Sequence, residues 1–225
     1  MGRGEPPADK ATLALRMSGN PGYFRRVDES DDRDFYVMPR LVIHVDEHGS
    51  AALTEFFGRA FKSGARVLDL MSAYRSHLPD DGEYARIVGL GMNVTELLEN
   101  TALRGAVVQD LNRLPTLPFA DDSFDACLIS FSIQYLTQPV RVLADVARVL
   151  QPGGAFYVAY TNRMFPTKAV LIWPNSTDRG RVDLVGTYME AAEIFEDIQG
   201  TLINPETSPP DDPMYVVYSR KAPSA

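Results

Sequence analysis

The stretch SFDACLISFSIQYLTQPVRVLADVARVLQPGGAFYVAY, residues 123–160, decides the fold of this chain. Residues 123–130 are an apolar run typical of a buried strand, and residues 155–160 form another. Pro139 marks the start of a helix between them, which the Pro-Gly-containing residues 151–154 bring to an end. The apolar residues at helical spacing are Val140, Leu143, Ala144, Ala147 and Leu150. A strand, a helix and a second strand in this order predict a βαβ unit with parallel strands.

Further strands of the same kind precede this unit. Apolar runs at residues 66–70, 85–90 and 105–108 each have the length of a buried strand. Asn93 and Glu96 are spaced as a capping box, with the asparagine at the N-cap, so a helix is predicted from there to about residue 100. The alternation of strands and helices predicts a mostly parallel sheet.

The C-terminal part of the chain has a different pattern. Residues 193–202 and 214–218 are two strand-like runs, joined by a proline-rich loop over residues 205–213. The pattern places no helix between them, which predicts an antiparallel hairpin at the edge of the sheet.

The N-terminal part is predicted to cover the sheet rather than to form it. Residues 1–20 are rich in Gly, Pro and charged residues and are expected to be a frayed or disordered terminus. Residues 23–40 mix aromatic with acidic side chains, and residues 51–61 carry one apolar helical stripe. We therefore expect a single domain over residues 21–225, with an N-terminal cover (21–60) and a core (61–225).

Composition and charge narrow the classes of function. The chain has 225 residues, and its 22 Lys and Arg against 30 Asp and Glu give a net charge of -8. An acidic surface disfavours nucleic acid as a partner, and the short apolar runs predict no membrane segment. The N-terminus has no apolar signal-peptide region, so a cytoplasmic location is expected. Cys127 is the single cysteine, which excludes an intrachain disulfide. The oligomeric state stays open.

Several motifs in fixed order resemble the class I S-adenosylmethionine (SAM) methyltransferases, over residues from about 60 to 220. The stretches that carry the resemblance are Val67 to Leu70, Val88 to Asn93, Val108 to Asn112, Leu117 to Asp125 and Arg148 to Gly154. The resemblance implies an α/β fold with three layers: a Rossmann-like seven-stranded mixed sheet with an antiparallel last strand and an N-terminal helical cover. It also implies SAM as cofactor and a small molecule as substrate.

The resemblance assigns the cofactor site to the carboxyl ends of the strands. Asp110 is expected to accept from the adenine amine, and Asp69 to organise the first loop and contact the amino group of the cofactor. The expected cofactor-binding residues are Asp69, Met71, Ser72, Ala73, Arg75, Gly91, Met92, Asn93, Asp110, Leu111 and Ser130.

Two departures from the family pattern stand out. Met71, Ala73 and Arg75 occupy positions where the family has glycines, which permit close backbone approach and positive φ. Gly91 stands where an acid usually holds the ribose, and the loss of such a charge-assisted bond is worth roughly 1.5–3 kcal/mol. Asn93 and Glu96 are the nearest replacements, although both also suit helix capping. Arg75 is expected to pair with the carboxylate of the cofactor, the alternative being a solvated loop residue.

The acceptor side offers several candidates. The candidate catalytic residues are His44, His77 and Tyr135, with core packing an equal interpretation of the tyrosine. The candidate substrate-binding residues are Tyr36, Arg40, Gln134, Asn162 and Arg163. The spacing of His44 and His48 suits metal ligands on a helix, but Gly49 favours a helix end there, and no metal is expected. Residues 165–168 are predicted to begin a helix that carries residues 171–173.

The function expected from the sequence is methyl transfer from SAM to an unidentified small molecule. One alternative is a non-catalytic, methyltransferase-like binding or regulatory protein, and another is an enzyme that uses a modified SAM or a different nucleoside. The chain lacks the G-x-S-x-G and P-loop motifs, which sets hydrolase and P-loop chemistry aside.

Overall fold

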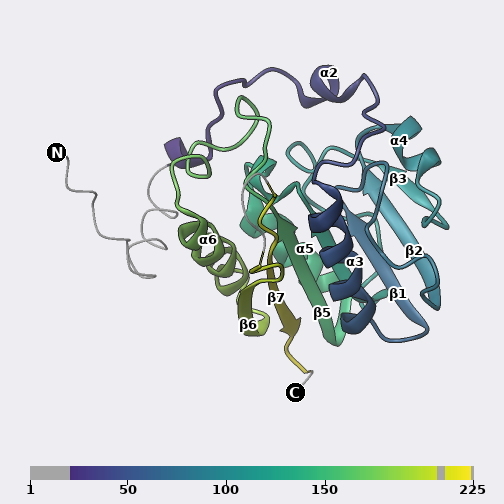
Figure 1. Cartoon of the computed structure of the whole chain (residues 1–225). Coiled ribbons are helices and arrows are strands. Elements are labelled where there is room, and N and C mark those ends of the chain that lie inside the picture. The colour runs from purple at the N-terminus through teal and green to yellow at the C-terminus, as the bar shows by residue number, and fades with distance from the viewer. Residues whose placement is uncertain (1–20, 207–210, 224–225) are drawn as a thin grey trace.

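The computed structural model describes residues 21–206 and 211–223, so the terminus predicted at residues 1–20 lies outside the described residues. A seven-stranded sheet in the order β3-β2-β1-β4-β5-β7-β6 forms its centre (Figure 1). The strands are β1 (Ala65–Leu70), β2 (Tyr84–Gly91), β3 (Ala106–Val108), β4 (Phe124–Ser130), β5 (Leu150–Tyr160), β6 (Phe195–Leu202) and β7 (Tyr215–Lys221). The helices are η1 (Pro21–Phe24), α2 (Asp32–Tyr36), α3 (Glu47–Ala60), α4 (Val94–Glu99), η2 (Ile133–Tyr135), α5 (Pro139–Val149) and α6 (Asp178–Ala191).

The direction of the strands confirms the predicted mixed sheet. Strands β3, β2, β1, β4 and β5 pair in parallel, whereas β7 runs antiparallel to both of its neighbours, β5 and β6. Strand β7 is therefore the antiparallel strand of the sheet, as the terminal hairpin predicted. The predicted βαβ unit is β4, α5 and β5.

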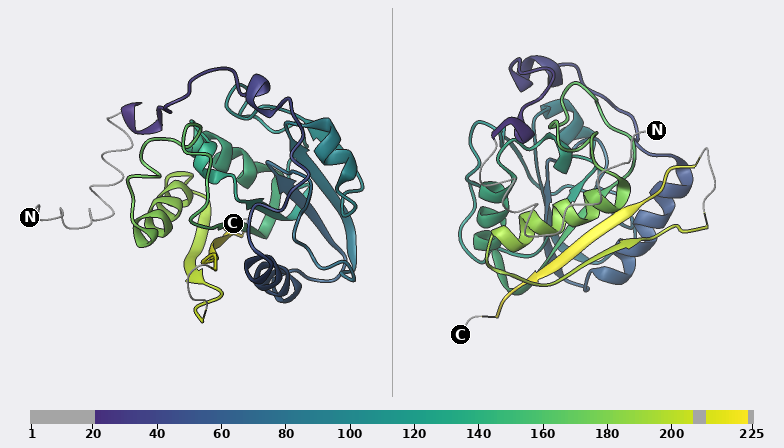
Figure 2. Two further views of the ribbon diagram at one scale, coloured as in Figure 1. Left: turned by 45° about the horizontal axis from the view of Figure 1, so that its top comes forward. Right: turned by 90° about the vertical axis from the view of Figure 1, so that its left-hand side faces the viewer.

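Apolar side chains on both faces of the sheet make it the middle of three layers (Figure 2). One face packs against α5 and α6 around buried residues such as Leu68, Ile129 and Val158. The other face packs against α3, where Phe57 meets Val67 and Leu128. Neighbouring residues of one strand thus enter opposite cores, as the two-residue period of a strand requires.

Two predictions are wrong. No helix ends at His48 and Gly49; a helix begins there instead, because Asp46 is the N-cap of α3 and its carboxylate accepts from the backbone N–H of Gly49 at 2.7 Å. Residues 165–176 form turns rather than a helix, and an isolated β-bridge pairs Val170 with Arg26. Helix α6 was not predicted from the sequence.

The N-terminal segment, residues 21–44, crosses over the carboxyl ends of the parallel strands (Figures 1 and 2). We call this segment the cover. Its backbone is bonded to the turns after β5, because Asp28 N–H donates to Thr167 and the Ile172 N–H donates to Tyr23. The helices η1 and α2 are its regular parts, so the predicted helical character is limited to short turns.

A cluster of buried charges fixes the cover to the core. Lys168 is fully buried, and its Nζ lies 3.1 Å from Asp32 and 3.3 Å from Asp28. Arg26 Nη1 donates to both oxygens of Asp32 at 2.7 Å. Buried charges are costly unless they are paired. Moving the cover away from Lys168 would break these ion pairs, so the cluster holds the cover in one position over the sheet.

The connection from β1 to β2 contains no helix. Residues 71–83 pass from one strand to the next as turns and extended backbone. The loop after β1 therefore presents side chains and backbone groups, rather than a helix N-terminus, to the edge of the sheet. No helix within residues 21–206 and 211–223 has the length and apolarity needed to cross a membrane.

Candidate functional site

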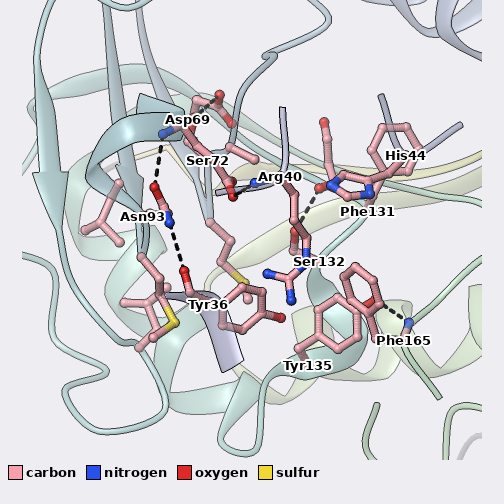
Figure 3. A pocket seen from close by; sticks show the side chains of 18 of the residues that line it. Tyr36, Arg40, His44, Asp69, Ser72, Asn93, Phe131, Ser132, Tyr135 and Phe165 are labelled. Carbon is pink, nitrogen blue, oxygen red and sulfur yellow. Dashed lines mark hydrogen bonds between the residues drawn. The ribbon is translucent and has the colours of Figure 1, made fainter. Parts of the chain in front are cut away.

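A cavity of about 340 Å³ lies between the cover and the carboxyl ends of the strands (Figure 3). Its floor consists of the residues that follow β1, β2, β3 and β4, and its roof is the cover. Open α/β sheets bind ligands at this edge, where the strand order changes direction; here the change occurs between β1 and β4. The volume falls within the range of ligand pockets.

The structure brings most of the predicted site residues together around this cavity. It is lined by Tyr36, Arg40, His44, Asp69, Met71, Ser72, Ala73, Arg75, His77, Gly91, Met92, Asn93, Asp110, Leu111, Ser130, Tyr135 and Arg163. Gln134 and Asn162 do not line it. The short helix η2 turns Gln134 into the protein interior, where its amide donates to the Phe131 carbonyl, and Asn162 is exposed beside Thr161.

Asp69 organises the loop that follows β1. The carboxylate is buried, and its Oδ2 accepts from the hydroxyl groups of Ser72 at 2.7 Å and Ser76 at 2.6 Å. Asn100 extends the network by donating to the Ser76 hydroxyl and to the Ala73 carbonyl. Burial raises the pKa of Asp69 to about 6, against the two serine hydrogen bonds, which lower it. The group is therefore ionised at pH 7 but titrates close to that pH.

Strained backbone gathers around the cavity. Met71, His77 and Phe131 have φ angles of 56°, 57° and 59°, in the left-handed region that non-glycine residues rarely adopt. Met71 therefore adopts a conformation that the family's glycines provide without strain. Residues in such conformations persist where the surrounding structure holds them, and they cluster at functional sites.

The end of β2 explains why Gly91 replaces the usual acid. The Ser72 N–H donates to the Leu90 carbonyl, which draws the first loop across the end of β2. A Cβ at position 91 would overlap the carbonyl oxygen of Ser72. No side chain fits there, so an acid at this position is incompatible with the path of the loop.

Asn93 and Glu96 are committed to other contacts. The side-chain oxygen of Asn93 caps α4 by accepting from the N–H groups of Thr95 and Glu96, and its amide donates to the Tyr36 carbonyl. One oxygen of Glu96 accepts from the backbone N–H of Arg40 at 2.6 Å. Both side chains thus tie the cover to α4, which leaves the second oxygen of Glu96 as the nearest carboxylate for a ribose.

Asp110 follows β3 and is half-buried. It accepts from the backbone N–H of Asn112, whose own amide reaches Asp32 of the cover and the Tyr135 carbonyl. Burial raises the pKa of Asp110, and the nearby charges of Asp32 and Asp31 raise it further. Asp110 thus lines the cavity at the end of β3, two strands away from Asp69 of β1.

Aromatic rings gather at one end of the cavity, which we call the aromatic end. Phe35 and His44 each meet Phe165 edge to face, and Tyr135 stacks on Phe165 with centroids 5.9 Å apart. The Tyr135 hydroxyl accepts from the Phe165 backbone N–H at 2.9 Å, so this tyrosine both packs and lines the cavity. Arg40 projects into this group of rings (Figure 3).

Both candidate histidines are neutral at pH 7. Burial, together with the charge of Arg40, lowers the pKa of His44. Burial and the charge of Arg75 lower the pKa of His77 to about 4, and its Nδ1 lies 3.1 Å from the Ser50 hydroxyl. A neutral imidazole can accept a proton, but a pKa of about 4 makes His77 a weak base at pH 7, so His44 is the better suited of the two. His48 is exposed in the first turn of α3, so it shares no helical face with His44, which precedes that helix.

The two predicted arginines at the rim differ in their partners. Arg163 forms an ion pair with the buried carboxylate of Asp212 at 2.7 Å, which neutralises much of its charge. Arg75 is exposed beside the first loop, and it has no carboxylate within 4.0 Å among the described residues. Arg75 is therefore the more available cation near Asp69.

Several lining residues were not predicted as site residues. They are Asp32, Val42, Ile43, Leu90, Gln109, Asn112, Phe131, Ser132, Leu136, Met164 and Phe165. Glu96, which the sequence offered as a replacement for the missing acid, also lines the cavity. Gln109 and Asn112 lie close to Asp110 in the motif from Val108 to Asn112, so this motif could have identified them. Asp32 and Phe165 come from segments that only the folded chain brings together.

Comparisons with known proteins agree with this geometry. Residues 72–158 match a family model described as "Methyltransferase domain". A demethylmenaquinone methyltransferase from Beutenbergia cavernae is 34% identical over 101 residues, which cover 44% of this chain and 41% of that protein. The chain spans less than half the length of the curated relatives it matches.

Solved structures show the same fold. A SAM-dependent methyltransferase from Archaeoglobus fulgidus superimposes with a TM-score of 0.57 at 13% identity, covering 78% of this chain and 94% of that one. The [4+2]-cyclase SpnF superimposes with a TM-score of 0.57 at 14% identity, covering 99% of this chain and 100% of that one. The chain therefore has the fold of the class I methyltransferases.

Proposed function

We infer, from the class I methyltransferase fold and the methyltransferase-like sequence of residues 72–158, that this chain transfers a methyl group from SAM to a small molecule. The observation that carries the proposal is the cavity itself. It brings Asp69, near the end of β1, and Asp110, after β3, to one cavity that also has an aromatic end. A volume of about 340 Å³ lies in the range of pockets that hold one small ligand, which suits a nucleoside cofactor.

The residues present fit SAM at most positions. Asp69 offers a buried carboxylate for an amino group, and Asp110 offers one for the adenine amine. The hydroxyl of Ser130 is buried without a hydrogen-bond partner among the described residues, as expected of a group that awaits a ligand. The ribose lacks its usual acid because Gly91 must be glycine, and Glu96 is the substitute we propose.

The chemistry asked of the protein is mainly positioning. Bound SAM would supply a methyl group activated by a positively charged sulfur. The cover and the aromatic end hold the acceptor in line with that methyl group and exclude water, which provides much of the rate enhancement of such displacements. His44 is the proposed base, because it is neutral and lies beside the rings where the acceptor would bind.

A second candidate function is ligand binding without methyl transfer. The strained Met71 and the glycine at position 91 favour it, since both depart from the cofactor loop of the family. In this case the cavity would hold a different nucleoside, or the chain would act as a binding or regulatory protein.

Calorimetric titration of the purified protein with SAM and with S-adenosylhomocysteine tests the proposal. We expect micromolar binding of both, and Asp110→Asn should weaken it about tenfold because a charge-assisted hydrogen bond is lost. Asp121→Asn, at an exposed carboxylate outside the cavity, is the matched control. The absence of binding at millimolar concentrations would reject the methyltransferase function in favour of the second candidate.

A further inference from the structure

We propose that Arg40 is the anchor for an anionic oxygen on a planar acceptor molecule, so that the substrate class is an aromatic acid. This inference rests on the proposed function for the identity of the cofactor. It adds the chemistry of the second molecule, argued from the side chains of this chain.

The first observation is the position of the guanidinium. Its central carbon lies 4.6 Å from the ring centroid of Phe35, 5.2 Å from that of Phe165 and 5.4 Å from that of Tyr36. Rings on several sides remove water from the guanidinium and restrict it to one orientation. Figure 3 shows the group projecting into the cavity between Tyr36, Tyr135 and Phe165.

The second observation is an unfilled hydrogen-bond donor. Arg40 Nη2 donates to the Phe35 carbonyl at 2.9 Å, whereas Nη1 is buried and has no partner among the described residues. A buried donor left without a partner is costly, and exceptions in folded proteins often mark functional groups. The Nη1 group therefore points to a place where an acceptor atom of a ligand would complete its hydrogen bonding, since the described residues supply none.

The third observation is an unbalanced charge. Other largely buried arginines have carboxylate partners: Arg26 pairs with Asp32 at 2.7 Å, and Arg181 with Asp178 at 3.1 Å. No carboxylate of the described residues lies within 4.0 Å of the Arg40 guanidinium, since Glu96 accepts from its backbone N–H instead. Its partly buried positive charge calls for a negative partner, which a bound anion would provide.

The location favours the acceptor over the carboxylate of the cofactor. Arg40 belongs to the aromatic end of the cavity with Phe165 and Tyr135, whereas Arg75 is the cation of the loop that carries Asp69. The surrounding rings also suit a flat molecule, because aromatic surfaces stack on one another. A planar acid satisfies the rings and the free Nη1 together.

The test compares two probes of similar shape, 4-hydroxybenzoate and 4-hydroxybenzamide, in which an uncharged NH2 donor replaces one carboxylate oxygen. Each is titrated calorimetrically into the full-length protein in saturating S-adenosylhomocysteine. We expect the wild type to bind the benzoate about tenfold or more tightly than the benzamide, as befits a charge-assisted contact. Arg40→Gln should abolish this preference. Arg40→Lys keeps the positive charge but lacks the paired N–H donors of the guanidinium, so it should retain part of the preference.

Arg33→Gln is the matched control, because Arg33 lies on the same cover but is exposed and paired with Asp31. It should leave the preference unchanged. Thermal unfolding of each variant shows whether it is folded, because Arg40→Gln also removes the hydrogen bond to the Phe35 carbonyl and the contacts with three rings.

Equal affinity for both probes in the wild type, or no binding of the benzoate at millimolar concentration, would overturn the proposal. A selective loss of S-adenosylhomocysteine affinity in Arg40→Gln would also overturn it, by assigning the arginine to the cofactor. Failure of the wild type to bind SAM, with the benzoate preference intact, would reject methyl transfer and keep the anion site.

Discussion

Asp69 shows how one buried carboxylate can link ligand binding to pH. Its two serine donors hold it in place, while burial raises its pKa to about 6. The carboxylate is charged above that pH and neutral below it, so its attraction for a cationic amino group is present at pH 8 and lost as the pH falls through about 6.

We therefore expect the affinity of the protein for SAM to decrease below pH 6. Asp69→Asn should bind SAM about tenfold more weakly at pH 8, and its affinity should change little between pH 8 and pH 5. Calorimetry at a series of pH values measures both effects, with Asp121→Asn again as the exposed control. A wild-type affinity that stays constant from pH 8 to pH 5 would contradict this role for Asp69.

Gly91 is a position where a missing side chain is structural. The Ser72 carbonyl occupies the space of a Cβ, so Gly91→Ala must displace the first loop. We expect a loss of about 1–3 kcal/mol in the free energy of unfolding, as for other overpacked sites, with a parallel loss of SAM affinity. Chemical denaturation measures the stability.

The control is Gly186→Ala in α6, where a Cβ would lie 3.6 Å from the Ile198 methyl group in ordinary contact. There the better helix propensity of alanine should maintain or raise stability by about 0.5–1 kcal/mol. Equal effects of the two substitutions would show that the position of Ser72 does not constrain residue 91.

At the scale of elements, the cover is held by a small number of buried charges. Lys168 bridges Asp28 and Asp32, so Lys168→Met leaves buried carboxylates with fewer partners. Breaking a buried ionic group in this way costs about 3 kcal/mol or more. We expect the cover to detach while the sheet stays folded.

Hydrogen exchange measures this directly. The amide of Asp28, which donates to Thr167, should lose protection in Lys168→Met, whereas amides in β1 and β4 should keep theirs. Arg59→Gln, which removes an exposed ion pair with Glu55 on α3, is the control and should change neither. Uniform loss of protection in the lysine variant would show that cover and sheet unfold together.

The elements also show what local sequence could predict. The central strands β1, β4 and β5 were found because each contains a continuous apolar run, the pattern that burial on both faces requires. Helix α6 was missed because arginines, aspartates and glycines interrupt its sequence, so its place depends on contacts with α5 and β6 rather than on periodicity. The false helix at residues 165–168 reflects the pairing of that segment with the cover.

For the whole molecule, the two halves of the cavity differed in how far they could be predicted. The floor comes from strand ends in sequence order, so the motifs located Asp69 and Asp110 at the cavity directly. The aromatic end joins the cover to the turns after β5, and Phe165 carries no local signal of that contact. Tertiary structure alone brings Arg40 and Phe165 together.

The bonds between the cover and residues 167–172 also set an order of events during biosynthesis. A ribosome makes the cover before the sheet, yet the turns to which it docks emerge only after β5. The floor of the cavity, which needs strands up to β4, can therefore assemble on the nascent chain before its roof. A segment translated ahead of the sheet is thus among the last to reach its final place, and the aromatic end of the cavity is completed when it does.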